Sequence, residues 1–272
     1  MATVSILIPT YNGASYIAPA IDSVLEQHGV DLEIIVVDDN STDDTVAIVR
    51  GYNDRRVRLS QNAANLGAEG NWNRALELAK GAYIKLLPQD DLLRPGCLAA
   101  QIAALAADTE ENIALVFGAR EIIDRSGRVI TRRGFQGAPG RIAAASIVRA
   151  CVRKGTNVIG EPGAVLFRRS LAEHIGPFNS AQPYIIDLDY WLRLLAHGDA
   201  WYIERPVSAF RVSSGSWSVA IGARQSRQFA DFLDRVQRAG LISASRSDVA
   251  IGKIKAKLNN VLRLLFYKLV MR

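Results

Sequence analysis

Two pairs of adjacent carboxylates are the residues most able to do chemistry. Asp38-Asp39 directly follows the apolar run 32–37, and Asp90-Asp91 comes shortly after a second run of this kind. Carboxylates set side by side are costly unless they meet a cation or hydrogen-bond donors. A hard divalent cation, Mg²⁺ or Mn²⁺, shared with a phosphate group is the simplest explanation. Two other interpretations stay open: a helix cap for the first pair and a solvated turn for the second.

The pattern of apolar segments indicates where these pairs lie. Over the first 120 residues, short apolar runs typical of strands alternate with segments of helical periodicity. We expect strands over 4–8, 32–37, 57–59, 82–87 and 113–117. We expect helices over 17–25, over 68–80 and over 95–107, and a further helix that starts after a cap within 41–43 and ends at about residue 50. This order predicts an α/β fold with a Rossmann-like, mostly parallel sheet flanked by helices. Ligands bind beyond the carboxyl ends of such strands, so both acidic pairs should converge at one edge.

The rhythm changes after Gly118. We expect a hairpin around Ser126-Gly127, a loop over 131–140, a helix over 142–153, a strand over 164–167, a helix over 188–196, short strands over 201–203 and 207–212, and helix from 225 onward. No internal repeat and no long linker is visible. The sequence therefore predicts one domain over 1–220, in two parts, 1–118 and 119–220, with a helical C-terminal extension over 221–272.

Composition excludes several classes of protein. Hydrophobic residues make up 49% of the 272 and charged residues 22%, which favours a packed globular core. Two cysteines and three histidines without ligand spacing argue against a disulfide framework and a zinc site. The net charge of +6 resides in 241–272, so we expect no nucleic-acid partner. Without a signal-peptide pattern or a membrane-length apolar run, we expect a cytoplasmic protein.

Glycine-rich motifs that mark other enzymes are missing from the sequence. The first strand is not followed by G-x-G-x-x-G, and no G-x-x-x-x-G-K-[ST] occurs, which argues against a dinucleotide site of that type and excludes a P-loop. The absence of G-x-S-x-G makes α/β-hydrolase chemistry a poor explanation as well.

An ordered series of motifs resembles the family 2 glycosyltransferases of GT-A fold. The matching segments are 4–13 (VSILIPTYNG), 23–27 (SVLEQ), 33–43 (EIIVVDDNSTD), 65–67 (NLG), 81–83 (GAY), Asp90-Asp91, 176–179 (GPFN), 187–194 (DLDYWLRL) and 210–212 (FRV). Each piece is weak alone, but the series spans roughly residues 3–218. The resemblance implies transfer of a sugar from a nucleotide-diphosphate sugar to an acceptor hydroxyl, with inversion at the anomeric carbon.

The resemblance also implies roles for particular residues. It assigns donor binding to Pro9, Thr10, Tyr11, Asp38, Asp39, Asn65, Asp90 and Arg211. Asp91 would be the ligand of Mg²⁺ or Mn²⁺, with Asp90 as its partner nearer the ribose. Asp187 would be the general base, with a helix N-cap as its alternative. Glu161 and Trp191 would contact the acceptor, although a loop acid and a core residue explain them equally well. Residues 1–118 then bind the nucleotide sugar and 119–220 the acceptor.

Three positions depart from the family pattern. Pro88 replaces a frequent additional acid, Ser213 a frequent histidine, and Ile186 the acid before the base. The first two keep open a degenerate, non-catalytic glycan-binding or scaffold protein. A nucleotidyltransferase of similar sheet is a further alternative, although the usual Gly-rich basic loop after the first strand is missing.

The basic tail suggests partners. Apolar residues recur at helical spacing over 251–272, with Lys and Arg on the other faces. Such a helix can lie on an anionic membrane surface, or pack on the domain or on a second subunit. Together with the resemblance, this favours a UDP-, GDP- or dTDP-sugar donor, a glycan or lipid-linked glycan acceptor in cell-surface polysaccharide or lipopolysaccharide synthesis, and a location at the inner face of the membrane.

Overall fold

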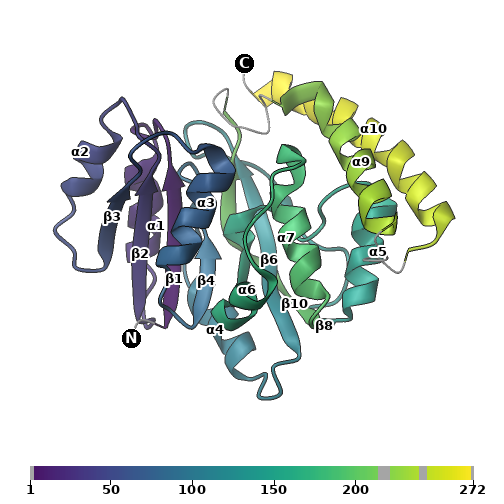
Figure 1. The fold of residues 1–272 in the computed structure, drawn as a ribbon, viewed down its shortest axis with the longest axis horizontal. Coiled ribbons are helices and arrows are strands. Elements are labelled where there is room, and N and C mark those ends of the chain that lie inside the picture. The colour runs from purple at the N-terminus through teal and green to yellow at the C-terminus, as the bar shows by residue number, and fades with distance from the viewer. Residues whose placement is uncertain (1–2, 214–220, 239–243, 271–272) are drawn as a thin grey trace.

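A computed structural model describes residues 3–213, 221–238 and 244–270. Its strands join into one twisted sheet with helices on both sides (Figure 1). Along the main path the strands are β3 (Val57–Gln61), β2 (Leu32–Asp38), β1 (Val4–Thr10), β4 (Tyr83–Leu86), β9 (Val165–Arg168), β6 (Ile113–Ile123), β10 (Asp199–Arg211) and β5 (Leu92–Leu93). Off this path, β7 (Val129–Arg133) pairs with β6, and β8 (Gly140–Ile142) pairs with β10. The predicted mostly parallel α/β sheet is confirmed.

Strand direction brings the carboxyl ends of β1, β2, β3 and β4 to one edge. These four strands are mutually parallel. β9 runs antiparallel to both β4 and β6, so β6 returns to the common direction, and β10 pairs parallel with β6. The loops that leave β1, β2, β4 and β6 therefore surround the same edge of the sheet, which is where a ligand site is expected.

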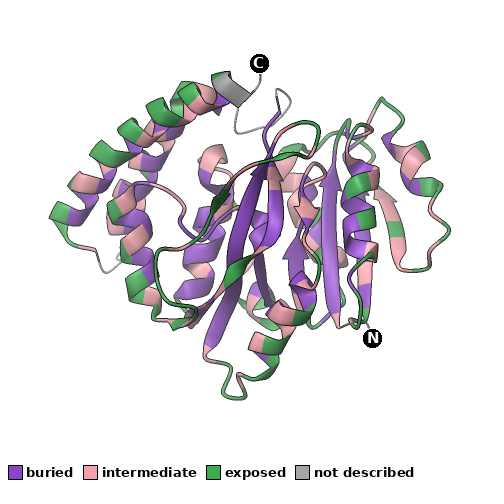
Figure 2. Cartoon of the chain, turned by 180° about the vertical axis from the view of Figure 1, so that it is seen from behind, coloured by how far each residue is buried: buried purple, intermediate pink, exposed green. Residues whose placement is uncertain are grey.

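Both faces of the sheet are buried. In β1, Ile6 and Ile8 pack into one core, with α1 (Ile17–Leu25), α2 (Thr45–Arg50) and α4 (Cys97–Ala106). Leu7, which points the other way, packs into a second core. That core includes α3 (Gly67–Leu78), α5 (Ala144–Lys154), α6 (Arg169–Ile175), α7 (Ile186–Leu195) and α9 (Gln225–Arg238). Figure 2 shows the central strands as buried along most of their length, which explains the unbroken apolar runs in the sequence.

Two predictions for the second half need correction. The expected loop over 131–140 is partly strand, because β7 continues to Arg133 opposite Arg120 and β8 begins at Gly140. The two short strands expected near 201–212 form one strand, β10, whose register against β6 shifts on both sides of Pro206. Proline lacks an amide hydrogen, so the ladder is interrupted there without ending the strand.

The C-terminal helices pack on the same core. α10 (Arg246–Val270) lies beside α9 at one side of the molecule (Figure 1) and also crosses α5. Gly252 permits this crossing, since a Cβ atom there would lie 2.1 Å from the carbonyl oxygen of Val152. Buried Phe229 and Ala256 join α9 and α10 to the core formed by the sheet. α10 is therefore held in a fixed orientation against the rest of the protein.

Candidate active site

A large cleft opens at the carboxyl ends of the parallel strands. Its volume is about 950 Å³. Eight residues predicted for the site line it: Pro9, Thr10, Tyr11, Asp39, Asn65, Asp90, Glu161 and Asp187. Four others, Asp38, Asp91, Trp191 and Arg211, are buried and do not belong to the lining. The convergence of both acidic pairs on one edge of the sheet is thus observed, with one member of each pair facing the cleft.

The loop after β1 is fastened to the loop after β4 by Gln89. Its Oε1 accepts hydrogen bonds from the Thr10 hydroxyl and, at 2.9 Å, from the Tyr11 amide, and its Nε2 donates to the Tyr11 carbonyl at 3.1 Å. Gly13 makes room for this contact, because a Cβ atom there would lie 2.3 Å from Gln89 Oε1. The Tyr11 ring is left 47% exposed at the cleft. The role of Gln89 is not visible in the sequence, because it depends on a contact across 78 residues.

Asp39 organises the neighbouring wall of the cleft. Its carboxylate accepts hydrogen bonds from Asn62 Nδ2 and the Leu66 amide, both at 2.8 Å, and from the Gly67 amide at 2.9 Å. Asp38 lies beneath, fully buried, and its Oδ2 accepts from the Ser41 amide at 3.1 Å. Asp39, which lines the cleft but is only 2% exposed, therefore holds the loop before α3, while Asp38 holds the turn that leads to α2.

Asp91 and Arg211 are buried behind Asp90 and hold its loop in place through hydrogen bonds. Asp91 Oδ1 accepts from the Arg211 amide at 2.9 Å, and Arg211 Nε donates to the Asp90 carbonyl at 2.9 Å. Arg211 Nη1 also donates, at 3.0 Å, to the carbonyls of Asp124 and Arg125 in the β6–β7 turn. Burial, together with the charge of Asp90, holds the pKa of Asp91 well above the usual range of a carboxyl group.

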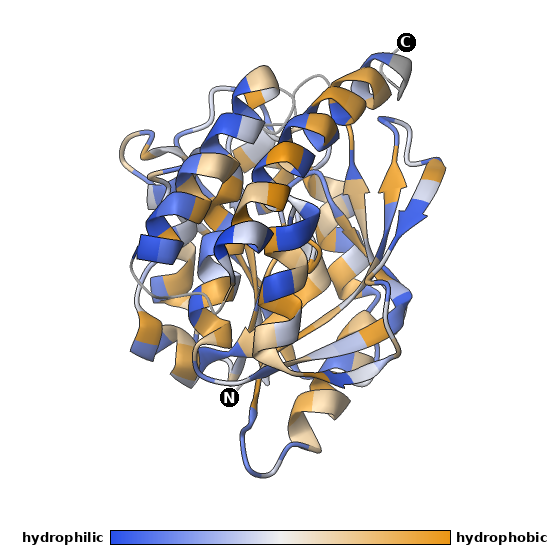
Figure 3. Cartoon of the chain, turned by 90° about the vertical axis from the view of Figure 1, so that its right-hand side faces the viewer, coloured by the Kyte–Doolittle hydropathy of each residue, from blue (hydrophilic) through white to orange (hydrophobic). Residues whose placement is uncertain are grey.

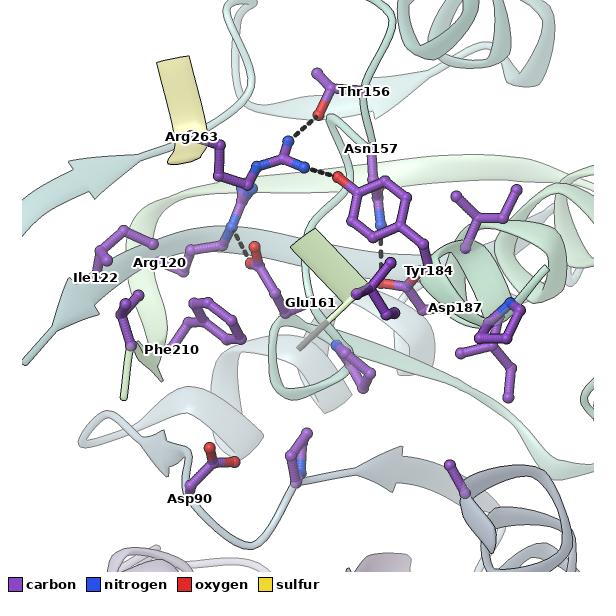
Figure 4. A pocket seen from close by; sticks show the side chains of 18 of the residues that line it. Asp90, Arg120, Ile122, Thr156, Asn157, Glu161, Tyr184, Asp187, Phe210 and Arg263 are labelled. Carbon is purple, nitrogen blue, oxygen red and sulfur yellow. Dashed lines mark hydrogen bonds and ion pairs between the residues drawn. The ribbon is translucent and has the colours of Figure 1, made fainter. Parts of the chain in front are cut away.

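This geometry changes the roles expected for the second acidic pair. The side chain that projects into the cleft is Asp90, as Figure 4 shows, whereas Asp91 is 1% exposed. Asp90, which was expected only as the partner of the metal ligand Asp91, is thus the member of the pair that a ligand in the cleft would meet. Arg211, expected to bind the donor, instead holds the loop that carries Asp90 and does not line the cleft.

The oxygen atoms that the protein offers in the cleft suit a divalent cation only if a bound molecule supplies further ligands to the same ion. Asp90 offers one carboxylate to the cleft, and Pro88 stands beside it. Within the described ranges, no group of three or more His, Cys, Asp or Glu side chains could hold a metal by itself. Mg²⁺ and Mn²⁺ accept phosphate and water oxygens readily, so a diphosphate could complete the coordination begun by Asp90.

Asp187 lies on the opposite side of the cleft, in the first turn of α7. Asn157 Nδ2 donates to its Oδ2 at 3.0 Å, and the Leu188 amide donates to its Oδ1 at 2.6 Å. The helix N-cap is Ile185, so the capping alternative does not describe this residue. Burial, reinforced by the charge of Glu161, raises the pKa of Asp187 to about 7. A carboxylate with that pKa can accept a proton effectively near neutral pH.

Glu161 lines the cleft and is close enough to Asp91 and Asp187 for its charge to act on both. It forms an ion pair with Arg120, and its charge raises the pKa of both Asp91 and Asp187 (Figure 4). Trp191, by contrast, has no exposed surface and donates from Nε1 to the Gly160 carbonyl at 3.3 Å. The structure therefore places Trp191 in the core that supports the Glu161 loop, and not at a wall where an acceptor sugar could pack.

A cationic residue from the C-terminal helix also reaches the cleft. Arg263 of α10 donates to the Tyr184 hydroxyl and, at 3.4 Å, to Thr156 Oγ1 (Figure 4). It also donates to Gln225 Oε1 at 2.5 Å. Burial lowers its pKa, and the charges of Arg133 and Arg120 lower it further. In the sequence Arg263 is one of several basic residues on the polar faces of an amphipathic helix, and nothing in the local pattern shows what its face meets.

Comparison with known sequences identifies the class of protein. The family model "Glycosyl transferase family 2" matches residues 5–176. A Mycobacterium tuberculosis relative, uncharacterized protein MT1568, is 35% identical over 230 residues, 81% of this chain and 70% of its own. The chain thus belongs to glycosyltransferase family 2. An Escherichia coli relative, the UDP-Glc:alpha-D-GlcNAc-diphosphoundecaprenol beta-1,3-glucosyltransferase WfgD, is 33% identical over 192 residues, 71% of this chain and 69% of its own.

Solved structures agree with the GT-A fold. Staphylococcus aureus TarS residues 1–349, in complex with UDP-GlcNAc, superposes with a TM-score of 0.69 at 19% identity, covering 96% of this chain and 73% of that one. The Pyrobaculum calidifontis mannosyltransferase PcManGT, in complex with GDP-Man and Mn²⁺, gives a TM-score of 0.65 at 21% identity, covering 99% and 74%. The protein is a glycosyltransferase with a GT-A fold and C-terminal helices packed on it.

Proposed function

We propose that this glycosyltransferase moves a sugar from a nucleotide-diphosphate sugar to an acceptor hydroxyl with inversion. The observation that carries the proposal is the placement of Asp90 and Asp187 on opposite sides of one cleft (Figure 4). Asp90 suits the diphosphate end of a donor, and Asp187 suits the deprotonation of an acceptor. Residues 1–118 would supply the donor half of the cleft and 119–220 most of the acceptor half.

The proposed donor site lies between the loops after β1, β2 and β4. Tyr11 is exposed enough to cover a base, and Asp39 and Asn65 line the wall beside it. Asp90 would hold Mg²⁺ or Mn²⁺ jointly with the donor diphosphate, and the ion would neutralise charge on the departing nucleoside diphosphate. A UDP-, GDP- or dTDP-sugar would fit this description.

The proposed reaction is a direct displacement at the anomeric carbon. The Asp187 carboxylate takes the proton of the acceptor hydroxyl, and the acceptor oxygen forms a bond to the anomeric carbon. The bond from that carbon to the diphosphate oxygen breaks on the opposite face, and the nucleoside diphosphate leaves with the electron pair. A base with a pKa of about 7 is well matched to this step at neutral pH.

The acceptor we propose is a lipid-linked glycan carrying a diphosphate, used in cell-surface polysaccharide or lipopolysaccharide synthesis at the inner face of the membrane. Names of relatives support the class, including a Campylobacter jejuni GalNAc(5)-diNAcBac-PP-undecaprenol beta-1,3-glucosyltransferase, 37% identical over 133 residues, 47% of this chain and 41% of its own. Charge supports it too: Arg133 and Arg263 lie in the lining near Arg120, which is paired with Glu161. An anion would offset this excess of positive charge.

A product analysis tests the proposal. The protein is incubated with nucleotide sugars and a lipid-diphosphate-linked sugar, with Mn²⁺ or with EDTA, and NMR gives the anomeric configuration of the product. We expect transfer with inversion, lost in Asp187→Asn and kept in Asp231→Asn, a matched change of an exposed carboxylate on α9. Retention of configuration, or full transfer by Asp187→Asn, would refute the mechanism. Donor binding without any turnover would instead favour the non-catalytic alternative.

A further inference from the structure

The outward face of α10 carries a stripe of exposed aliphatic side chains. They are Ile254, Leu258, Val261, Leu262 and Leu265, with exposed fractions of 70, 58, 56, 55 and 53%. Their spacing places them on one side of the helix. Across the described residues only three other large hydrophobic side chains are comparably exposed, Tyr11, Leu66 and Val129, and none of them lies on α10. Figure 3 looks at the side of the molecule where α9 and α10 lie, and hydrophobic segments recur along the outer helices.

The opposite face of α10 is already used. Val249, Ala256 and Tyr267 are buried against the protein. Asn259 donates from Nδ2 to the Lys154 carbonyl at 2.7 Å, and Asn260 donates from Nδ2 to the Ala223 carbonyl at 2.9 Å. These contacts fix the rotation of the helix about its axis. The stripe therefore points away from the body of the protein as a consequence of packing, and the domain cannot cover it without giving up those contacts.

Charge identifies the kind of surface that fits the stripe. From Val249 to the end of the sequence there is no Asp or Glu, but six basic residues: Lys253, Lys255, Lys257, Arg263, Lys268 and Arg272. Lys255, Lys257 and Lys268 are exposed. A second copy docked through the same stripe would set like charges against each other. Anionic headgroups above an apolar layer complement both features.

We propose that α10 lies flat on an anionic lipid surface, with the stripe in contact with the acyl boundary and its lysines at the headgroups. The stripe extends over about 16 Å of helix, at about 1.5 Å per residue. No helix within the described ranges is both long and apolar enough to cross a membrane. The same helix supplies Arg263, Phe266 and Tyr267 to the lining of the cleft. Docking along the stripe would thus place α10 between the lipid surface and the part of the cleft that these three residues line.

Vesicle flotation tests this inference without any sugar transfer, so its failure is distinguishable from failure of the proposed reaction. The full chain is mixed with phosphatidylcholine vesicles, with or without phosphatidylglycerol. We expect flotation with the anionic vesicles, reduced about tenfold or more in the triple variant Leu258→Asn, Leu262→Asn, Leu265→Asn, and also reduced in Lys255→Glu, Lys257→Glu. Val129→Asn, which changes an exposed valine on β7, should float like the wild type.

Controls separate the possible outcomes. Because the altered side chains of the triple variant are exposed, its circular dichroism spectrum and melting temperature should match those of the wild type. Failure of the folded wild type to float with anionic vesicles would overturn the inference. Light scattering that shows a dimer, lost in the triple variant, would assign the stripe to a second copy instead and would also overturn it. Equal flotation by the triple variant would exclude α10 as the contact.

Discussion

Asn157 donates a hydrogen bond of 3.0 Å to Asp187 and holds this carboxylate against the turn before β9. The same Nδ2 donates to the Gly160 carbonyl at 2.9 Å, and the side-chain oxygen of Asn157 accepts from the Ile159 and Gly160 amides at 3.0 and 3.1 Å. The amide is thus fixed by its neighbours and cannot turn away. It stabilises the charged form of Asp187, which burial opposes.

Asp187→Asn should remove the proton acceptor while preserving shape. We expect kcat for transfer to fall by roughly 10²–10⁴-fold, with little change in the Kd of the donor. In the wild type, kcat should fall as the pH drops through about 7, because the carboxylate becomes protonated there. Single-turnover rates across pH, together with calorimetric donor binding, measure both effects. An unchanged rate in the variant would exclude Asp187 as the base.

The same substitution should change the dependence of stability on pH. The folded-state pKa of Asp187 is raised, so burial of the neutral acid favours folding at low pH, and this advantage disappears as the pH rises through about 7. Asparagine does not ionise. The melting temperature of Asp187→Asn relative to that of the wild type should therefore be higher at pH 8 than at pH 5. Thermal unfolding followed by circular dichroism at both pH values checks the sign.

Asn157→Leu keeps a similar volume but removes the hydrogen bond to Asp187. Without this bond the pKa of Asp187 should rise further, since burial and the charge of Glu161 remain. The acidic limb of the plot of kcat against pH should therefore move to higher pH. The kcat that the variant loses at neutral pH should be partly recovered at high pH, where Asp187 is again ionised. A uniform loss at every pH would instead show that Asn157 acts only by supporting the fold.

Asp90 and Asp91 should respond differently to the same change. Asp90→Asn should weaken the joint binding of Mn²⁺ and a nucleoside diphosphate by tenfold or more, because the one acid of this pair that faces the cleft loses its charge. Asp91→Asn should bind nearly as well, since an amide oxygen can still accept from the Arg211 amide. Titration calorimetry with Mn²⁺ and UDP, GDP or dTDP compares the two. The reverse order would restore Asp91 as the metal ligand.

Trp191→Phe separates a core role from a role in acceptor binding. The indole is fully buried and bonded to the Gly160 carbonyl, so its loss should lower the free energy of unfolding by about 1–3 kcal/mol. The KM for the acceptor should stay within about twofold once the protein is folded, because the ring has no surface in the cleft. A raised KM at unchanged stability would return Trp191 to the acceptor site.

The fold was largely predictable because its signals are local. Strands buried on both faces appear as apolar runs, and Asp38 and Asp90 stand directly at strand ends or in the loops that follow. The different roles of Asp90 and Asp91 were not predictable, since they depend on which carboxylate Arg211 meets across 120 residues. Gln89 and Arg263 reach the cleft through tertiary contacts that leave no trace in nearby sequence. The sequence is compatible with Trp191 either in the core or at the acceptor site, and only the packing of α7 distinguishes the two.

Arg263 provides the sharpest test of the acceptor proposed here. Its guanidinium reaches the cleft from α10 and donates hydrogen bonds to the neutral side chains of Tyr184, Gln225 and Thr156. The charges of Arg133 and Arg120 lower its pKa, whereas the charge of Glu161 raises it. Arg263→Met should therefore raise the KM for a diphosphate-linked acceptor about tenfold, since charge-assisted hydrogen bonds are lost. The KM for an acceptor that lacks phosphate, and the Kd of the donor, should hardly change. Arg227→Met on α9, where the arginine is exposed, serves as the control. An equal rise in KM for both acceptors would show that Arg263 only supports the wall of the cleft, and a weaker donor affinity would place the anion it meets on the nucleotide.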